Sequence, residues 1–124
     1  VRCTSADFDQ IGTELAKFRN GLLVLDDATT YMYHGSKPLR ALRRTLVGRR
    51  HVGVDVLMHY HAIKQIAPDV RRLCDIMVLF PTNDNVDEIR RYNEFPNPGR
   101  IADNLRAVQA MDPATYPKII FEVQ

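Results

Sequence analysis

The sequence predicts an α/β fold, a three-layer sandwich with a mainly parallel sheet. Two observations support this prediction. Four short apolar runs have the length of strands, at residues 22–25, 54–58, 76–80 and 119–121. Segments with helical periodicity separate them, and such alternation is typical of β-α-β crossovers. The first and third runs are apolar at every position, which is the pattern of strands buried on both faces of a parallel sheet.

The expected helices have apolar residues three or four positions apart. They lie near residues 8–18, 39–47, 68–73, 86–92 and 101–108. Ser36 and Pro38 suit the start of the second helix, and Asn97 with Pro98 suits the start of the last. Residues 1–4 are a candidate fifth strand.

Length and composition favour one domain over residues 1–124. Apolar residues make up 45% of the 124-residue chain, as in globular proteins. No apolar run is long enough to cross a bilayer, so we expect a cytoplasmic or virus-associated protein. Cys3 and Cys74 have no CxxC partner, which favours reduced thiols over a disulfide or a zinc site.

The basic residues are mostly arginine, and several stand in pairs. Lys and Arg together number 17, and the net charge is +2. Arginine presents a planar set of donors that suits phosphate and carboxylate groups. Because 15 acidic residues accompany them, net charge alone does not predict nucleic-acid binding.

Two aspartates, Asp26 and Asp27, directly follow the first apolar run. Ligands bind at the carboxyl ends of the strands in open parallel sheets. Adjacent carboxylates repel each other unless a positive group lies nearby, and a Mg²⁺ ion beside nucleotide phosphates would meet that need. Alternatively, one of the two side chains caps the following turn.

Residues 22–80 resemble the HerA/FtsK group of P-loop ATPases, which includes zonular-occludens-toxin-like phage assembly proteins and viral genome-packaging ATPases. In that group a Walker B strand ending in two acidic residues precedes a helix and an Arg-His-x-Gly-x-Asp-like stretch, here at residues 50–55. A strand ending in a polar sensor follows, then a Pro-x-x-Arg-like helix start. The resemblance implies a RecA-like core, ATP and Mg²⁺ as cofactors, and a motor for DNA translocation, packaging or phage assembly. It also implies DNA as a partner and a homo-oligomeric ring such as a hexamer.

The resemblance assigns roles to residues at the ends of two strands. Asp26 would hold Mg²⁺, through water, and Asp27 would orient the water that attacks the γ-phosphate. Relatives commonly carry Glu at the second position, so Asp27 is one methylene shorter. His61 matches the γ-phosphate sensor, with His59 as the alternative. A loop exit without a chemical role is the other interpretation of both histidines.

The resemblance also concerns three arginines. Arg50 is similar to the arginine that relatives present across a subunit boundary, with Arg49 as the alternate. Favourable charge at a helix C-terminus would equally explain Arg49. Arg71 matches the Pro-x-x-Arg position, and its role stays open between function and structure.

No Gly-x-x-x-x-Gly-Lys-Ser/Thr stretch occurs in the sequence. That motif supplies the backbone N–H groups and the lysine that hold nucleotide phosphates. It precedes Walker B in this group, so we expect the chain to be the Walker B to C-terminal portion of an ATPase domain, lacking the Walker A unit. A degenerate relative of the group is the other interpretation. Alone, it is expected to be inactive.

Two other classes of function stay open. A phosphorelay receiver also has an acidic pair after a buried strand, but it needs a further Asp at the end of its central strand and a Lys after its last one. Here Asp55 begins a strand and Lys118 precedes one. A non-catalytic α/β scaffold is the other class, in which Arg40, Arg43 and Arg44 would follow nucleic-acid phosphates or hold a partner.

Overall fold

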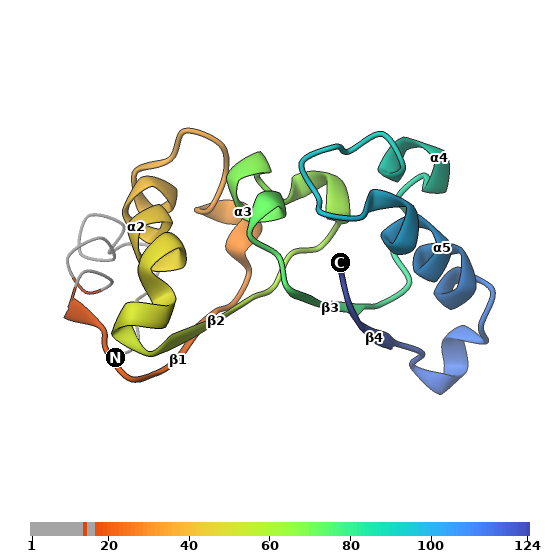
Figure 1. Ribbon diagram of the computed structural model, residues 1–124. Helices are drawn as coiled ribbons and strands as arrows, with labels where there is room; N and C mark the ends of the chain where they lie inside the picture. The colour runs from red at the N-terminus through yellow and green to blue at the C-terminus, as the bar shows by residue number, and fades with distance from the viewer. Residues whose placement is uncertain (1–13, 15–16) are drawn as a thin grey trace. The chain divides into compact units, whose positions relative to one another are not determined.

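A computed structural model describes residue 14 and residues 17–124 (Figure 1). The candidate strand at residues 1–4 and Cys3 lie outside the described residues, as does most of the first expected helix. The chain divides into two compact units. The first comprises Val1–His61 with Gln65–Ala67, and the second comprises Ala62–Lys64 with Pro68–Gln124. The expectation of one domain stays a prediction.

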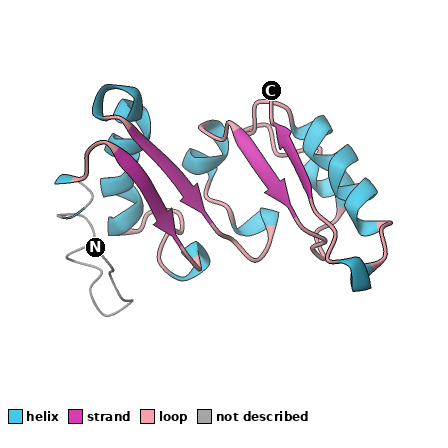
Figure 2. Ribbon diagram, turned by 90° about the horizontal axis from the view of Figure 1, so that it is seen from below, coloured by secondary structure: helices cyan, strands magenta, loops and turns pink. Residues whose placement is uncertain are grey.

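The first unit contains a β-α-β arrangement. Its elements are β1 (Gly21–Leu25), η2 (Ala28–Thr30), α2 (Lys37–Val52) and β2 (Val54–Met58). The two strands pair in parallel, as the arrows in Figure 2 show, with Gly21 opposite Val54 and Leu25 opposite Met58. The parallel pair joined by a helix confirms the predicted alternation for this part of the chain.

Local residues set both ends of α2. The Ser36 hydroxyl oxygen accepts a hydrogen bond from the Leu39 N–H at 3.2 Å, and Pro38 lies in the first turn. Gly53 ends the helix with φ 65°, a left-handed conformation that favours glycine. A Cβ atom at Gly53 would lie 2.5 Å from Asn20 Oδ1, so a larger residue would both strain the backbone and displace the Asn20 side chain. The end of α2 therefore explains why glycine occupies this position of the Arg-His-x-Gly-x-Asp-like stretch.

The parallel pair is buried on one face only. Leu39, Leu42 and Leu46 of α2 are buried. Leu22, Val24 and Leu57 share the opposite face and are 59%, 57% and 51% exposed. In the described residues the first run is therefore covered on one face only, where the sequence predicted burial on both faces. A run of apolar residues does not reveal whether a second layer covers it.

Gly48 lies inside α2, where glycine costs about 1 kcal/mol relative to alanine. Nothing lies within 4 Å of the position that a Cβ would take there. The described part of the chain thus gives no packing reason for this glycine. Val47 beside it is 69% exposed, so it does not belong to the buried stripe that the sequence predicted.

The second unit contains α3 (Pro68–Arg72), β3 (Ile76–Leu79), α4 (Val86–Ile89), α5 (Pro98–Gln109), η4 (Pro113–Thr115) and β4 (Ile119–Glu122). The short helix η3 (Ile63–Gln65) also belongs to it, except for Gln65, which is part of the first unit. The Asn97 side chain accepts from the Arg100 N–H at 3.1 Å and begins α5, as predicted. The apolar face of α5 lies in the core, with Ile101, Leu105 and Val108 fully buried.

β3 and β4 pair antiparallel, with Ile76 opposite Glu122 and Leu79 opposite Ile119. The described residues thus form one parallel and one antiparallel pair, where the sequence predicted a mainly parallel sheet. The sequence does not show the direction of a strand, because side chains alternate between the two faces in the same way in parallel and antiparallel strands. Ile76 and Val78 of β3 are 63% and 41% exposed, so the third apolar run is also covered on one face only.

Cys74 is a free, half-buried thiol, as expected. Its Sγ–H donates to the Ile76 carbonyl at 3.6 Å. Burial and the nearby Asp75 raise the pKa of the thiol to about 11, so it stays protonated at neutral pH. Within the part of the chain that the structure describes, no helix is long and apolar enough to cross a membrane.

Candidate functional site

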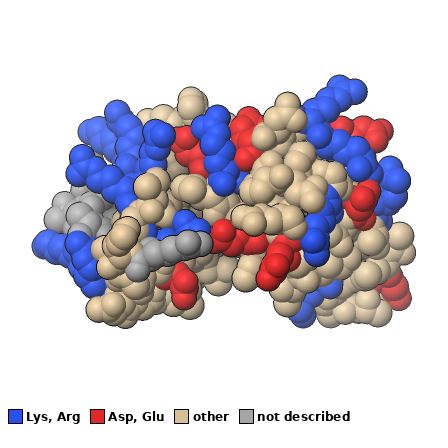
Figure 3. Space-filling view, viewed as in Figure 1, with Lys and Arg blue, Asp and Glu red and all other residues tan. Residues whose placement is uncertain are grey.

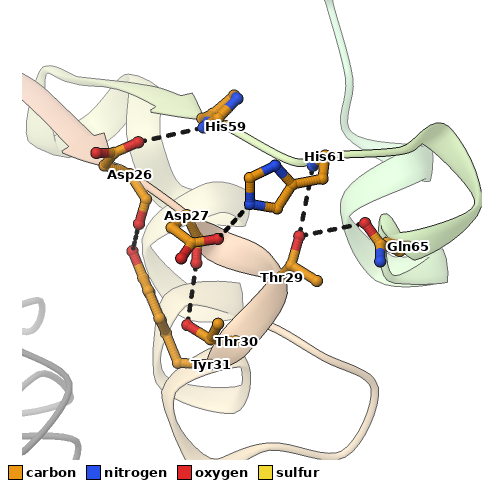
Figure 4. Close-up of polar contacts among 8 residues, drawn as sticks. All are labelled: Asp26, Asp27, Thr29, Thr30, Tyr31, His59, His61 and Gln65. Atoms are coloured by element: carbon orange, nitrogen blue, oxygen red, sulfur yellow. Dashed lines mark hydrogen bonds and ion pairs between the residues drawn. The ribbon is translucent and has the colours of Figure 1, made fainter. Parts of the chain in front are cut away.

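Polar residues gather where β1 and β2 end. Because the strands are parallel, their carboxyl ends lie at the same edge of the pair. Backbone pairing continues beyond the carboxyl ends of β1 and β2. The His59 N–H donates to the Leu25 carbonyl at 3.0 Å, and the Ala28 N–H donates to the His59 carbonyl at 2.8 Å. These two bonds hold Asp26 and Asp27 beside the segment that carries His59 and His61 (Figure 4).

Each aspartate pairs with one histidine. His59 Nδ1 lies 3.2 Å from Asp26 Oδ1, and His61 Nε2 lies 2.8 Å from Asp27 Oδ1. In each pair the ring nitrogen that faces the carboxylate carries the proton, because a carboxylate only accepts. The two imidazole rings meet edge to face, with centroids 5.3 Å apart. The two donors relieve the repulsion between the adjacent carboxylates, and all four side chains stay open to solvent.

The backbone at Asp27 is left-handed, with φ 50° and ψ 47°. Few residues other than glycine adopt this conformation, and Asp and Asn are the main exceptions. The Asp27 side chain makes no capping bond to η2, and its carbonyl accepts instead from the Thr30 N–H and hydroxyl. This turn leaves the Asp27 carboxylate pointing to His61 (Figure 4). Capping is therefore not what its side chain does here.

Neighbouring side chains fix the two loops. The Tyr31 hydroxyl donates to the Asp26 carbonyl at 2.7 Å, and Thr29 Oγ1 accepts weakly from the His61 N–H at 3.5 Å. The Tyr60 hydroxyl donates to the Met32 carbonyl at 3.1 Å. Burial, and then the nearby Tyr31, raises the pKa of Tyr60, so its hydroxyl stays a donor. None of these roles had a signal in the sequence, because each joins residues through a loop.

The aspartates fit a water-mediated magnesium site better than a complete one. Among the described residues, no group of three or more His, Cys, Asp or Glu could hold a metal ion. Mg²⁺ keeps several waters and takes one or two carboxylates together with substrate phosphates. The Asp26 side chain, 88% exposed, meets that requirement as a single carboxylate reached through water.

Arg49 and Arg50 both lie near the end of α2. Arg49 Nη1 donates to the Leu46 carbonyl at 2.7 Å, in agreement with a role at the helix C-terminus. Arg50 lies in the last turns of α2, and its side chain is outside what the structure describes.

Arg71 is a core residue of the second unit, only 7% exposed. Its guanidinium carbon lies 4.1 Å from the centroid of the Tyr92 ring and 5.7 Å from that of Phe95. Nη2 donates to the Lys64 carbonyl at 3.0 Å, and Nη1 lies 3.6 Å from a Glu94 carboxylate oxygen. The open question of its role therefore has a structural answer.

The receiver interpretation finds no support in the first unit. Asp55 pairs with Leu22 at the start of the strands, whereas Asp26 and Asp27 follow their far ends. The acidic residues that a receiver would bring together are thus apart.

These elements define an α/β fold with a polar edge at the carboxyl ends of its parallel strands. Neither the protein families nor the curated proteins that were compared give a match to the chain. The solved structures include the genome packaging NTPase B204 of Sulfolobus turreted icosahedral virus 2 in complex with AMP, which is similar with a TM-score of 0.67 and 19% identity. The match covers 98% of this chain and 59% of that one. At this identity the likeness shows the fold alone, and the chain spans about three fifths of the length of its neighbour.

Proposed function

We propose that the chain is the Walker B and sensor part of an ATP-driven DNA packaging or translocation motor. The pairing of Asp27 with His61 at the carboxyl ends of β1 and β2 carries this proposal. The fold shared with a genome packaging NTPase supports it. The resemblance of residues 22–80 to the HerA/FtsK group assigns the same edge to the nucleotide.

Each residue of the edge then has a distinct task. Mg²⁺ would neutralise charge on the nucleotide phosphates, and Asp26 is the residue to hold it through water. Asp27 orients the attacking water, and its left-handed backbone turns the carboxylate to His61. His61 senses the γ-phosphate while its pairing with Asp27 fixes the ring. The second pair, Asp26 with His59, is longer and holds the metal-side carboxylate.

The proposal requires a phosphate-binding loop that these residues do not contain. The exposed apolar face of Leu22, Val24 and Leu57 supports a further layer at the first unit. A parallel strand pair is rarely left open to water on an apolar face. We propose that a part of the full-length protein outside this sequence covers this face and brings the Gly-x-x-x-x-Gly-Lys-Ser/Thr loop to the edge.

The histidines offer a matched test in the full-length protein. We expect His61→Ala to lower DNA-stimulated ATP turnover at least about tenfold with nucleotide binding kept, because the imidazole that holds the Asp27 carboxylate in position is lost. His61→Gln should retain more turnover, since its amide can still donate. His59→Ala is the control on the same segment and should have a smaller effect. Equal losses at both histidines, or no loss at His61, would contradict the assignment.

Arg50 provides a test of the ring. Its role across a subunit boundary implies that Asp27→Asn and Arg50→Ala variants are each nearly inactive alone. A 1:1 mixture should regain roughly a quarter of the native turnover, because one interface in four joins an intact Asp27 to an intact Arg50. Absence of any recovery in mixed assemblies, checked by subunit exchange, would argue for a structural Arg50.

A further inference from the structure

The solvent face of α2 carries positive side chains along most of its length. Lys37, Arg40 and Arg44 are exposed at spacings of three and four residues, so they form one stripe with Arg43 beside it. The helix contains no Asp or Glu. Figure 3 shows lysine and arginine side chains gathered over this helix.

These four cations have no anionic partner among the described residues. Neither an ion pair nor a side-chain hydrogen bond involves them, whereas Arg71, Arg72 and Arg90 each have a carboxylate nearby. Like charges at such spacings destabilise an isolated helix. The stripe therefore favours an external anion that would relieve this repulsion.

A depression of about 520 Å³ accompanies the stripe, lined by Arg40, Arg43, Arg44, Val47 and Gly48. At Gly48 the helix backbone is accessible from the depression, since nothing lies within 4 Å of the position that a Cβ would take. Glycine allows a ligand to approach the backbone closely. Packing does not require this glycine, and three arginines without a partner among the described residues lie beside it. Both features fit the close approach of a phosphate backbone to the helix.

We propose that this face of α2 binds the phosphate backbone of duplex nucleic acid. The planar arginine fork suits phosphate better than an ammonium group does. From Lys37 to Arg44 the helix rises about 10 Å, a span that meets about three phosphates of one strand. The helix has no Phe, Tyr or Trp among Lys37–Val52 to stack on unpaired bases, which favours a duplex over a single strand. The inference deepens the proposed function by naming the surface that would hold the DNA, but it needs no nucleotide chemistry.

The test compares two triple variants of the full-length protein. Arg40→Gln/Arg43→Gln/Arg44→Gln removes three charges from the stripe. Arg91→Gln/Arg106→Gln/Lys118→Gln removes three exposed charges from the second unit and is the matched control. Binding of a fluorescent 30-base-pair duplex is measured at several salt concentrations without nucleotide, so that loss of ATP turnover does not affect the result.

We expect the stripe variant to bind at least about tenfold more weakly near 0.1 M salt, with a salt slope lower by up to about three. The control should stay within about threefold of the native protein. Equal weakening in both variants would show an effect of net charge alone and overturn the proposal. Equal or tighter binding of polyglutamate to the stripe would assign it to an acidic protein partner and overturn it as well.

Gly48→Ala separates binding from folding. The substitution has room and favours helix, so the melting temperature should rise by about 3 °C. Duplex affinity should nevertheless fall, because the methyl group occupies the depression. A Gly48→Ala variant that is more stable and binds DNA with unchanged affinity would show that Gly48 is not part of the DNA-binding surface, and this result would count against the proposal. If Asp27→Asn leaves turnover intact while the stripe variant loses DNA, the proposed function fails and this inference stands.

Discussion

Asp27→Asn should lower ATP turnover of the full-length protein by about 1,000-fold while Mg-ATP still binds. The Asp27 carboxylate faces His61 at 2.8 Å, and its negative charge would orient and polarise the attacking water. An amide keeps the size and can still accept from the imidazole, but it carries no charge. Asparagine also tolerates the left-handed backbone at this position, so the turn should persist. Steady-state hydrolysis and fluorescent-nucleotide titration measure the two quantities.

Two further variants sharpen this test. Asp27→Glu keeps the charge and has the reach that relatives commonly show, so it should retain far more turnover than Asp27→Asn. Asp87→Asn removes an exposed carboxylate from the start of α4 and should leave turnover native. Hydrolysis by Asp27→Asn at the native rate would remove Asp27 from the chemistry, and with it the proposed motor.

Local sequence signals predicted the elements that surround the site. Ser36 and Pro38 determine where α2 begins through contacts within a few residues, so its start was readable from the chain. Its end at Val52, past the predicted residues 39–47, was not predicted. The bounds 54–58 of the second apolar run agree with β2 in full. The placement of Asp26 and Asp27 beside His59 and His61 follows from one further fact, that β1 and β2 are parallel.

Non-local features could not be predicted in the same way. The left-handed turn at Asp27 accompanies the hydrogen bond from the Ala28 N–H to the His59 carbonyl, which joins the two loops. No residue next to Asp27 in the sequence predicts this turn. The antiparallel direction of β4 depends on how the chain returns after α5. The exposed faces of β1 and β3 depend on which layers pack there, and apolar runs look alike whether one face is covered or both.

Arg71 illustrates the same limit and yields the second large effect. Its motif position suggested either chemistry or structure, and only the folded chain shows the guanidinium over Tyr92 with the Lys64 carbonyl as acceptor. We expect Arg71→Ala to destabilise the protein by about 3 kcal/mol, because it removes a buried cation–π contact and packing and leaves a carbonyl and Glu94 without their partner. The melting temperature, followed by circular dichroism, should fall by about 10 °C.

Its neighbour provides the control for this prediction. Arg72 is 61% exposed, and its ion pair within the described part of the chain is with Asp69, one turn away, at 3.5 Å. Arg72→Ala should therefore change stability by less than about 0.5 kcal/mol. Arg71→Lys tests geometry, since it keeps the charge but lacks the planar group that lies on the Tyr92 ring, and it should recover only part of the loss. If Arg71→Ala melts like Arg72→Ala but loses ATP turnover, Arg71 acts in function instead, and the Pro-x-x-Arg position belongs with the motor residues after all.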